Sequence, residues 1–321
     1  VSDFDGLKQG AQTIVSDAKL GLKALTKALA GYQVPAEWTS EIKERNAVWV
    51  AMRSAALNPD VIFDKSTLVG SEDTDAVLTQ GQLIGVLQEH SQSGDTLIVG
   101  AGGPPGDIQK VWDATDGRFA HIEFGFSCMG YELPAAIGVR LANPNPANRV
   151  TTYIGDGTFV MAPTELVTAC QEGLPMTIIV SENHGYQVIR RLQMGRVGHN
   201  FGNEFRYREP GPMVSEAATA AGKAPRLEGD FLQIDIVKMS EGMGAEAYRP
   251  MTANEFRKVL NDTRNAPGPV VIVVPTVPHA NLPASEVWWD VSPAEVSQNS
   301  PWIAGVMPPY IEGLATQRWH G

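Results

Sequence analysis

The chain has 321 residues, of which 43% are hydrophobic and 19% charged, a profile typical of a globular enzyme rather than a disordered or fibrous protein. Its formal net charge of -11 disfavours nucleic acid as a partner, since phosphate backbones are bound by clustered Lys and Arg. No apolar run approaches the ~20 residues that span a bilayer, so we expect a cytoplasmic protein with no membrane partner.

The beginning of the chain predicts little structure of its own. Residues 1–31 open with a short strand-like piece and continue with an amphipathic helix over residues 17–29, which Gly31 ends. One strand and one helix cannot form a domain, so this stretch is either an extension or, as we interpret it, the end of a central domain. Residues 32–76 mix prolines with charged residues and predict a connector with one helix around residues 41–56.

Residues 77–278 alternate between helical and extended patterns. The predicted elements are helices at residues 80–90, 107–112, 132–141, 163–172 and 252–261, and strands at residues 96–100, 150–154, 176–180 and 270–274, with a further strand that ends near Gly125. This alternation favours an α/β fold, a doubly wound parallel sheet covered by helices on both faces, with ligands at the carboxyl ends of its strands. Residues 279–321 are predicted to form an irregular C-terminal tail.

A glycine-rich turn after one of these strands forms the first candidate site. Gly155 and Gly157 flank Asp156, and such a turn lets the backbone approach a ligand closely. A predicted helix and strand then lead the chain to Asn183, 27 residues beyond Asp156. Because parallel strands joined by a crossover end at the same edge of a sheet, we expect the two side chains to be neighbours.

The oxygen atoms at this edge suit a hard metal ion. The carboxylate of Asp156, the amide oxygen of Asn183 and the carbonyl of Gly185 form an all-oxygen set, which Mg²⁺ prefers and which leaves positions for phosphate oxygens. A new helical pattern begins at Tyr186 and Gln187, and the amides of a helix N-terminus attract the same anion. Together these residues predict a site in which Mg²⁺ joins the protein to a diphosphate.

The order of strand, Gly-Asp-Gly turn, crossover and Asn resembles the cofactor motif of the thiamine diphosphate-dependent superfamily that includes acetolactate synthases and pyruvate decarboxylases. The resemblance implies thiamine diphosphate and Mg²⁺ as cofactors, with Asp156, Asn183 and Gly185 as metal ligands. It also implies cofactor contacts from the two turns, at Gly155, Asp156, Gly157, Thr158, Asn183, Gly185, Tyr186 and Gln187. One departure is Glu182, which stands where the superfamily has the first of two Asn residues.

A glycine- and proline-rich loop at residues 100–107 supports this interpretation. The loop follows a predicted strand and precedes a helix, so we expect the backbone amides of Gly103, Gly106 and Asp107 to contact a phosphate. In acetolactate synthases the equivalent loop carries Gln and His side chains, so backbone contacts must suffice here.

Residues 124–138 resemble the segment that holds the aminopyrimidine ring in this superfamily. The resemblance implies cofactor contacts from Phe126, Ser127 and Met129. Met129 would be the wedge beneath the bent cofactor, a role that suits its adaptable apolar side chain.

Within the superfamily, the chain is most similar to the trihydroxycyclohexanedione hydrolases of inositol catabolism. Residues 124–131, the Glu204-Phe205-Arg206 triplet and Pro105-Gly106-Asp107 carry this resemblance, together with residues near both ends of the chain. It implies a hydrolase that cleaves a carbon–carbon bond of a cyclic 1,2-diketone to give 5-deoxyglucuronate. Alternatives are an acetolactate synthase-like enzyme, a 2-keto acid decarboxylase or a non-catalytic cofactor-binding subunit.

The resemblance also implies that a second domain is needed. In the superfamily a Glu on the pyrimidine-binding domain activates the cofactor, so we expect no catalytic residue in this chain and place that Glu in an N-terminal half or a second chain. The expected partners are therefore that domain, a small-molecule substrate and further copies in a homodimer or homotetramer. Four polar residues stay open between substrate contact and loop ordering, namely Gln193, Asn203, Glu204 and Arg206.

Overall fold

A computed structural model describes residues 6, 10–68, 74–123, 125–197, 200–208, 227–283, 290–293 and 300–316. The chain divides into two compact units, Met52–Ser285 and a smaller one made of Val1–Ala51 with Glu286–Gly321. Within the described residues, no helix is both long and apolar enough to cross a bilayer.

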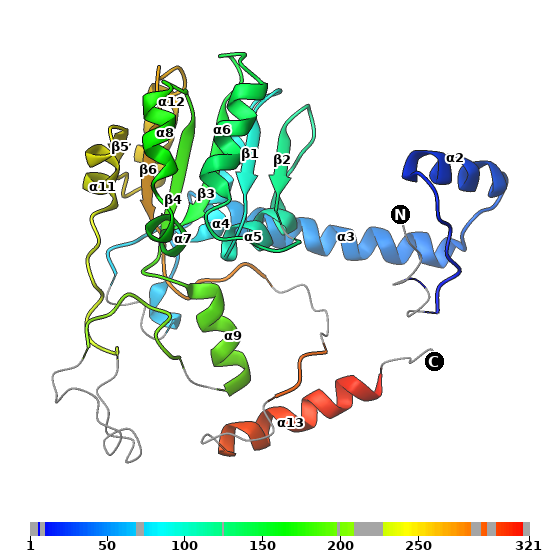
Figure 1. Ribbon diagram of the computed structural model, residues 1–321. Helices are drawn as coiled ribbons and strands as arrows, with labels where there is room; N and C mark the ends of the chain where they lie inside the picture. The colour runs from blue at the N-terminus through cyan, green and yellow to red at the C-terminus, as the bar shows by residue number, and fades with distance from the viewer. Residues whose placement is uncertain are drawn as a thin grey trace. The chain divides into compact units, whose positions relative to one another are not determined.

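A single parallel sheet organises the larger unit (Figure 1). In the described part of the chain, its strand order is β2-β1-β3-β4-β6-β5, with every neighbouring pair parallel. The strands are β1 Thr96–Val99, β2 Phe119–Ile122, β3 Val150–Gly155, β4 Thr177–Glu182, β5 Glu246–Tyr248 and β6 Val270–Pro275. Strands β4 and β6 are buried at every residue, as expected where helices cover both faces of a sheet.

Helices cover the two faces of the sheet, and the hydrophobic core lies between the helices and the strands. They are α4 Gln80–His90, α5 Gly103–Val111, α6 Glu132–Ala142, α7 Asp156–Met161, α8 Glu165–Gln171, α9 Gln187–Val197, α11 Ile236–Gly242 and α12 Ala253–Asp262. One continuous apolar cluster joins α6, α8 and α11 to the inward side chains of the strands, such as Ile178 and Val180. Helices α4 and α12 contact each other, and fully buried Phe256 lies on α12.

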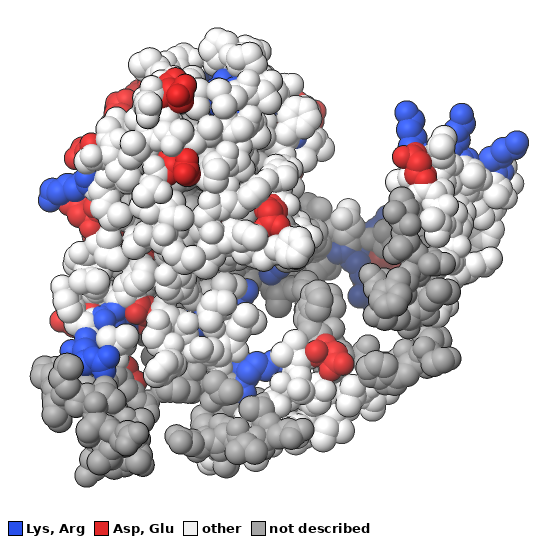
Figure 2. All heavy atoms as spheres, in the orientation of Figure 1, with Lys and Arg blue, Asp and Glu red and all other residues white. Residues whose placement is uncertain are grey.

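The smaller unit contains helices α2 Ala18–Ala28 and α13 Ser300–Ala315, together with most of α3 Ala36–Leu57, which continues into the larger unit. The side chain of Asp17 accepts a hydrogen bond from the amide of Leu20 and so caps the first turn of α2. Lysines project from α2 on the face seen in Figure 2, and helices α2 and α3 contain no buried residue. A short 3-10 helix, η1, spans Lys65–Thr67.

The predicted α/β fold with a parallel sheet is confirmed, whereas several boundaries were wrong. Helix α5 begins at Gly103 rather than at Asp107, because Pro104 and Pro105 fall in its first turn, where a missing N–H leaves no hydrogen bond unmade. Helix α7 forms directly after β3 and was not predicted, and the helix predicted at residues 163–172 is the shorter α8.

The sequence also missed elements toward the C-terminus. Helix α11 and the three-residue edge strand β5 were not predicted, since both are too short for their periodicity to stand out. The tail is not irregular throughout: α13 is a helix of 16 residues that contains Pro308 and Pro309, which count against a helix in sequence. The short strand-like piece predicted before residue 17 does not occur at residues 6 and 10–16, and the other residues of that stretch lie outside the described residues.

Replacing Phe256 with Ala should lower the free energy of unfolding by about 3–5 kcal/mol, because loss of a fully buried ring leaves a cavity. Urea unfolding followed by circular dichroism measures this change. Lys258→Ala on the same helix is the control, since that side chain is 75% exposed and should change stability by less than about 0.5 kcal/mol. Equal losses in the two variants would contradict the assignment of Phe256 to the core.

Candidate functional site

The carboxylate of Asp156 joins the ends of strands β3 and β4. The register of the two strands pairs Gly155 with Ser181, so both chains leave the sheet at the same edge. Asp156 Oδ2 accepts hydrogen bonds from the amides of Asn183 and Gly185, each at 3.1 Å, and Oδ1 accepts one from Gly157 at 2.7 Å. Asp156 and Asn183 are therefore neighbours, as predicted from their spacing.

The Asp156 carboxylate is buried without a cationic side chain beside it in the described part of the chain. The residue is 2% exposed, and burial raises the pKa of its carboxyl group to about 7. The ionised form accepts three backbone amides, but in the described part of the chain no Lys or Arg forms an ion pair with it. A cation bound at this position would supply the missing charge.

The loop after β4 has two consecutive residues with positive φ. His184 has φ +64° and Gly185 has φ +126°. The side chain of Asn183 is 5% exposed and makes no hydrogen bond to any described residue. This side-chain amide lines the cavities at the sheet edge, where its oxygen and nitrogen are available to a ligand. The carboxylate, this amide and the Gly185 carbonyl are the donor set that Mg²⁺ prefers.

A cavity of about 350 Å³ opens beside this loop. Many of the predicted cofactor-binding residues line it, namely Gly103, Ser127, Met129, Gly155, Gly157, Thr158, Asn183, Gly185, Tyr186 and Gln187. Its remaining lining is formed mainly by the first turns of α5 and α9 and includes Val188, Ile189 and Leu192. One region of the structure thus brings together residues from four separate segments of the sequence.

Four predicted residues do not line this cavity. Asp156 lies beneath it, and Phe126 is 90% exposed. Gly106 and Asp107 lie inside helix α5, where backbone amides ordinarily donate to the carbonyl four residues earlier rather than to a ligand. Because two prolines follow Gly103 and have no N–H, the α5 N-terminus offers fewer donors than the sequence suggested.

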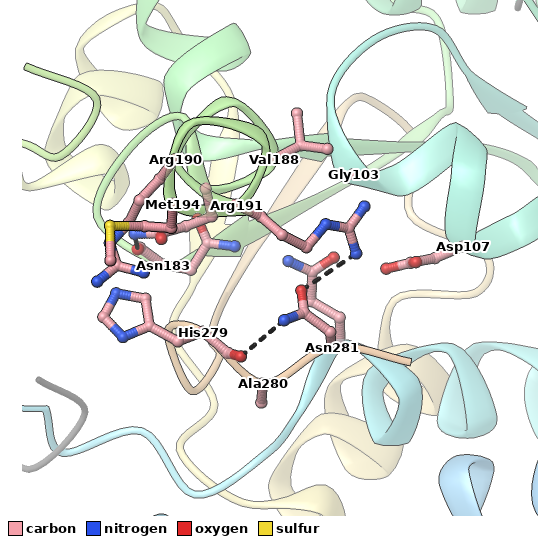
Figure 3. Close-up of a pocket in the computed structure, with 12 residues that line it drawn as sticks. Gly103, Asp107, Asn183, Val188, Arg190, Arg191, Met194, His279, Ala280 and Asn281 are labelled. Carbon is pink, nitrogen blue, oxygen red and sulfur yellow. Dashed lines mark hydrogen bonds between the residues drawn. The ribbon is translucent and has the colours of Figure 1, made fainter. Parts of the chain in front are cut away.

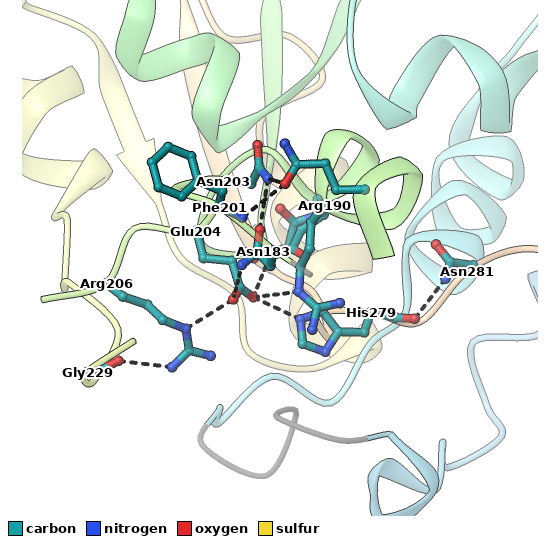
Figure 4. Close-up of polar contacts among 12 residues, drawn as sticks. Asn183, Arg190, Phe201, Asn203, Glu204, Arg206, Gly229, His279 and Asn281 are labelled. Carbon is teal, nitrogen blue, oxygen red and sulfur yellow. Dashed lines mark hydrogen bonds and ion pairs between the residues drawn. The ribbon is translucent and has the colours of Figure 1, made fainter. Parts of the chain in front are cut away.

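A second layer of polar residues supports the loop from outside (Figure 4). The Glu204 carboxylate, 6% exposed, accepts hydrogen bonds from Gln187, Asn200, Arg206 and His279. Burial alone would raise the pKa of Glu204, but the His279 hydrogen bond and the charges of Arg206 and Arg190 outweigh it and lower the pKa to about 2. Glu204 is therefore ionised and fully occupied by protein groups.

Backbone hydrogen bonds attach the same segment directly to the loop. The Tyr186 amide donates to the Asn203 carbonyl at 2.7 Å, and the Phe205 amide donates to the His184 carbonyl at 2.9 Å. Gln193 accepts hydrogen bonds from the Phe201 amide and the Asn203 side chain. The polar residues left open in the sequence, Gln193, Asn203, Glu204 and Arg206, thus make contacts that order this segment.

Glu182 has its own partner. Its carboxylate forms a two-pronged ion pair with Arg249, with N–O distances of 3.0 and 2.6 Å. Arg249 lies just beyond the unpredicted strand β5, so sequence reasoning could not anticipate the pair. The charge that replaces the usual Asn is therefore balanced by the protein and does not need a ligand.

Sequence reasoning missed three contributors to this region. Gln80, at the first position of α4, and the His279–Asn281 stretch after β6 line a second cavity beside the first. Arg190 and Arg191 on α9 also border it. None of these residues belongs to a recognised motif. The only related signal in the sequence was the helical pattern that begins at Tyr186 and Gln187 and continues through the two arginines.

Known proteins are similar to this chain in sequence. The family model "Thiamine pyrophosphate enzyme, C-terminal TPP binding domain" matches residues 100–274. Proteins named 3D-(3,5/4)-trihydroxycyclohexane-1,2-dione hydrolase from Clostridium tetani and Geobacillus thermodenitrificans are 30% and 34% identical over 93% and 92% of this chain. The chain spans 46% of the length of each relative.

Among solved structures, a thiamine diphosphate-dependent 4-hydroxybenzoylformate decarboxylase from Rhodococcus jostii is similar, with a TM-score of 0.48 and 21% identity. The match covers 63% of this chain and 33% of that chain.

Gly185→Ala should destabilise the loop by about 1–3 kcal/mol, because its φ of +126° is strained for Ala and the new Cβ would lie 2.5 Å from the Asn203 carbonyl oxygen. Thermal and urea unfolding measure the loss. Gly195→Ala is the matched control, because Gly195 lies in α9 with open space around it and the change should stabilise that helix by roughly 0.5–1 kcal/mol. A neutral Gly185→Ala variant would show that the loop tolerates other backbone angles.

Proposed function

The chain belongs to the thiamine pyrophosphate enzymes, whose C-terminal TPP-binding domain it carries, and we propose that it forms the Mg²⁺- and diphosphate-binding half of a hydrolase that opens a cyclic 1,2-diketone. The observation that carries the cofactor part of this proposal is the convergence of Asp156, Asn183 and Gly185 at one sheet edge. The substrate part rests on the named relatives and remains a proposal for this chain.

The residues at the sheet edge fit the metal and the cofactor. In the proposal, Asp156 and Asn183 supply side-chain oxygens and Gly185 a carbonyl oxygen to Mg²⁺, which leaves the remaining positions to diphosphate oxygens and water. The Gly103 amide and the N-terminus of α9 attract the diphosphate, and an 11-residue helix has a positive end suited to it. Charge is thus supplied locally in a chain whose net charge is negative.

The remaining cavity residues position the cofactor rings. Gly157 is in contact range of the Tyr186 ring, since a Cβ added there would lie 2.8 Å from two of its atoms, so any larger side chain would displace the ring. We propose that Met129 and Ser127 border the aminopyrimidine and that Val188 and Leu192 exclude water from the reacting carbon.

Bound thiamine diphosphate supplies a carbon nucleophile that attacks a carbonyl and then accepts the electron pair of the broken bond. The chain's own residues bind and orient the cofactor, while the activating carboxylate belongs to a pyrimidine-binding domain in an N-terminal half or second chain. The chain matches less than half of its relatives' length, which supports this division. In the superfamily the cofactor lies between domains of different subunits, which also favours a homodimer or homotetramer for this protein.

The reaction is tested on the complete protein together with its pyrimidine-binding domain. Given 3D-trihydroxycyclohexane-1,2-dione, the loaded protein should produce 5-deoxyglucuronate, detected by nuclear magnetic resonance, without releasing carbon dioxide. Given pyruvate, it should form neither acetolactate nor carbon dioxide. Turnover of pyruvate would instead support an acetolactate synthase-like enzyme or a 2-keto acid decarboxylase, and cofactor binding without any turnover would support a non-catalytic subunit.

Asp156→Ala should weaken binding of thiamine diphosphate with Mg²⁺ by more than about 100-fold, because it removes both a metal ligand and the acceptor that holds the Asn183 and Gly185 amides. Isothermal titration calorimetry on the complete protein measures the dissociation constant. Asp262→Ala is the control, because that side chain is 57% exposed at the end of α12, and it should leave the dissociation constant unchanged. Undiminished affinity in Asp156→Ala would overturn the proposed metal site.

A further inference from the structure

A second cavity, of about 230 Å³, adjoins the proposed cofactor cavity (Figure 3). The two share Gln80, Gly103, Asn183, Gln187 and Val188, so they meet at the same sheet edge. Helix α9 borders both cavities, and its residues 190, 191 and 194 line only the second one. Residues 186, 189 and 192 border the first.

Asp107 is the unexplained group in this second cavity. It lines the cavity from α5, is 8% exposed and makes no hydrogen bond to any described residue. Because no described residue donates to this carboxylate and it faces a cavity, its oxygens are available to accept hydrogen bonds from a ligand bound there. Burial raises the pKa of Asp107 to about 6, as expected for a carboxyl group that lacks donors.

The Arg191 guanidinium, a hydrogen-bond donor on α9, lies across the cavity from Asp107. Figure 3 shows the Arg191 guanidinium pointing toward the Asp107 carboxylate across the cavity. The two are not within ion-pair distance, and among described residues Arg191 donates to Asn281 Oδ1 at 3.2 Å. Asn281 is held in turn, because its amide nitrogen donates to the His279 carbonyl at 2.9 Å. A guanidinium has five N–H donors, so Arg191 retains donors for a ligand.

The chemistry of this lining selects the kind of ligand. Apart from Gly103 and Asn183, which the proposed function assigns to the diphosphate and Mg²⁺, the lining carries Asp107 and Arg191, and these two opposite charges together favour neither an anion nor a second metal ion. In the described part of the chain, no cluster of three His, Cys, Asp or Glu residues forms a metal site. A neutral molecule with adjacent hydroxyl groups can bind both side chains, because one hydroxyl donates to the Asp107 carboxylate while its neighbour accepts from the Arg191 guanidinium.

We propose that Asp107 and Arg191 form a subsite for two adjacent hydroxyl groups of a polyhydroxylated substrate, beside the cofactor. The proposal rests on the proposed function and deepens it, since it assigns the choice between hydroxylated and plain cyclic diketones to these two residues. Asp107 accepts from one hydroxyl, Arg191 donates to the next, and Asn281 orients the guanidinium.

The test uses the complete protein loaded with thiamine diphosphate and Mg²⁺, in the variants Asp107→Asn and Arg191→Ala. Asp107→Asn keeps the shape of the side chain, and Arg191 is exposed on α9, so neither change should prevent folding. Arg196→Ala is the matched control, because Arg196 is on the same helix but does not line the cavity. The probes are 3D-trihydroxycyclohexane-1,2-dione, cyclohexane-1,2-dione, which has no hydroxyl groups, and myo-inositol, a stable cyclic polyol.

Both variants should raise KM for the trihydroxylated dione and Kd for myo-inositol by at least about 10-fold, because each leaves a buried polar group unpaired in the complex. Neither should change kcat/KM for cyclohexane-1,2-dione or Kd for thiamine diphosphate by more than about 2-fold, since neither probe uses the hydroxyl subsite. Equal losses with both diones, or weaker cofactor binding in Asp107→Asn, would overturn the subsite and make Asp107 a residue of the cofactor site.

The two proposals fail in different ways. If the wild-type protein opens neither dione but its affinity for myo-inositol depends on Asp107 and Arg191, the proposed reaction is wrong and the subsite stands. If the trihydroxylated dione is opened and the variants leave its KM unchanged, the reaction stands and the subsite is wrong.

Discussion

The hydrogen bonds from the amides of Asn183 and Gly185 to the Asp156 carboxylate are the constraint on which the rest of the site depends. They join the ends of two parallel strands through one buried side chain, and they set the positive-φ turn that directs the Asn183 side chain toward the cavities. The backbone donors offset part of the cost of burying this carboxylate, although burial still raises its pKa. The turn therefore supplies the donors that the buried carboxylate needs, and the carboxylate holds the turn in its conformation.

Such a strained turn needs support, and residues 200–206 provide it. Glu204 gathers Gln187, Arg206 and His279, which come from three separate parts of the larger unit, and the backbone of the segment bonds to the loop itself. Gly185 is packed so closely against the segment that no side chain fits there. The loop is thus held by Asp156 on one side and by this segment on the other, an arrangement that fixes its backbone conformation.

The sheet edge contains two adjoining cavities with different chemistry. One is lined by glycines and apolar residues around the Asn183 loop and suits a cofactor that needs close backbone approach. The other carries Asp107, Arg191 and Asn281 and suits hydroxyl groups. Helix α9 borders both, so it can relate the position of a cofactor to that of a substrate.

The sequence by itself determined the parallel α/β fold and the pairing of Asp156 with Asn183, because both follow from local periodicity and from the rule that crossovers align strand ends. It misplaced the start of α5 at Asp107, since prolines read as a loop although a first helical turn accepts them. Only the tertiary structure decided that Arg249 neutralises Glu182, that Glu204 holds the loop and that Asp107 faces Arg191. Those contacts join residues far apart in sequence through side-chain packing, which leaves no periodic signal along the chain.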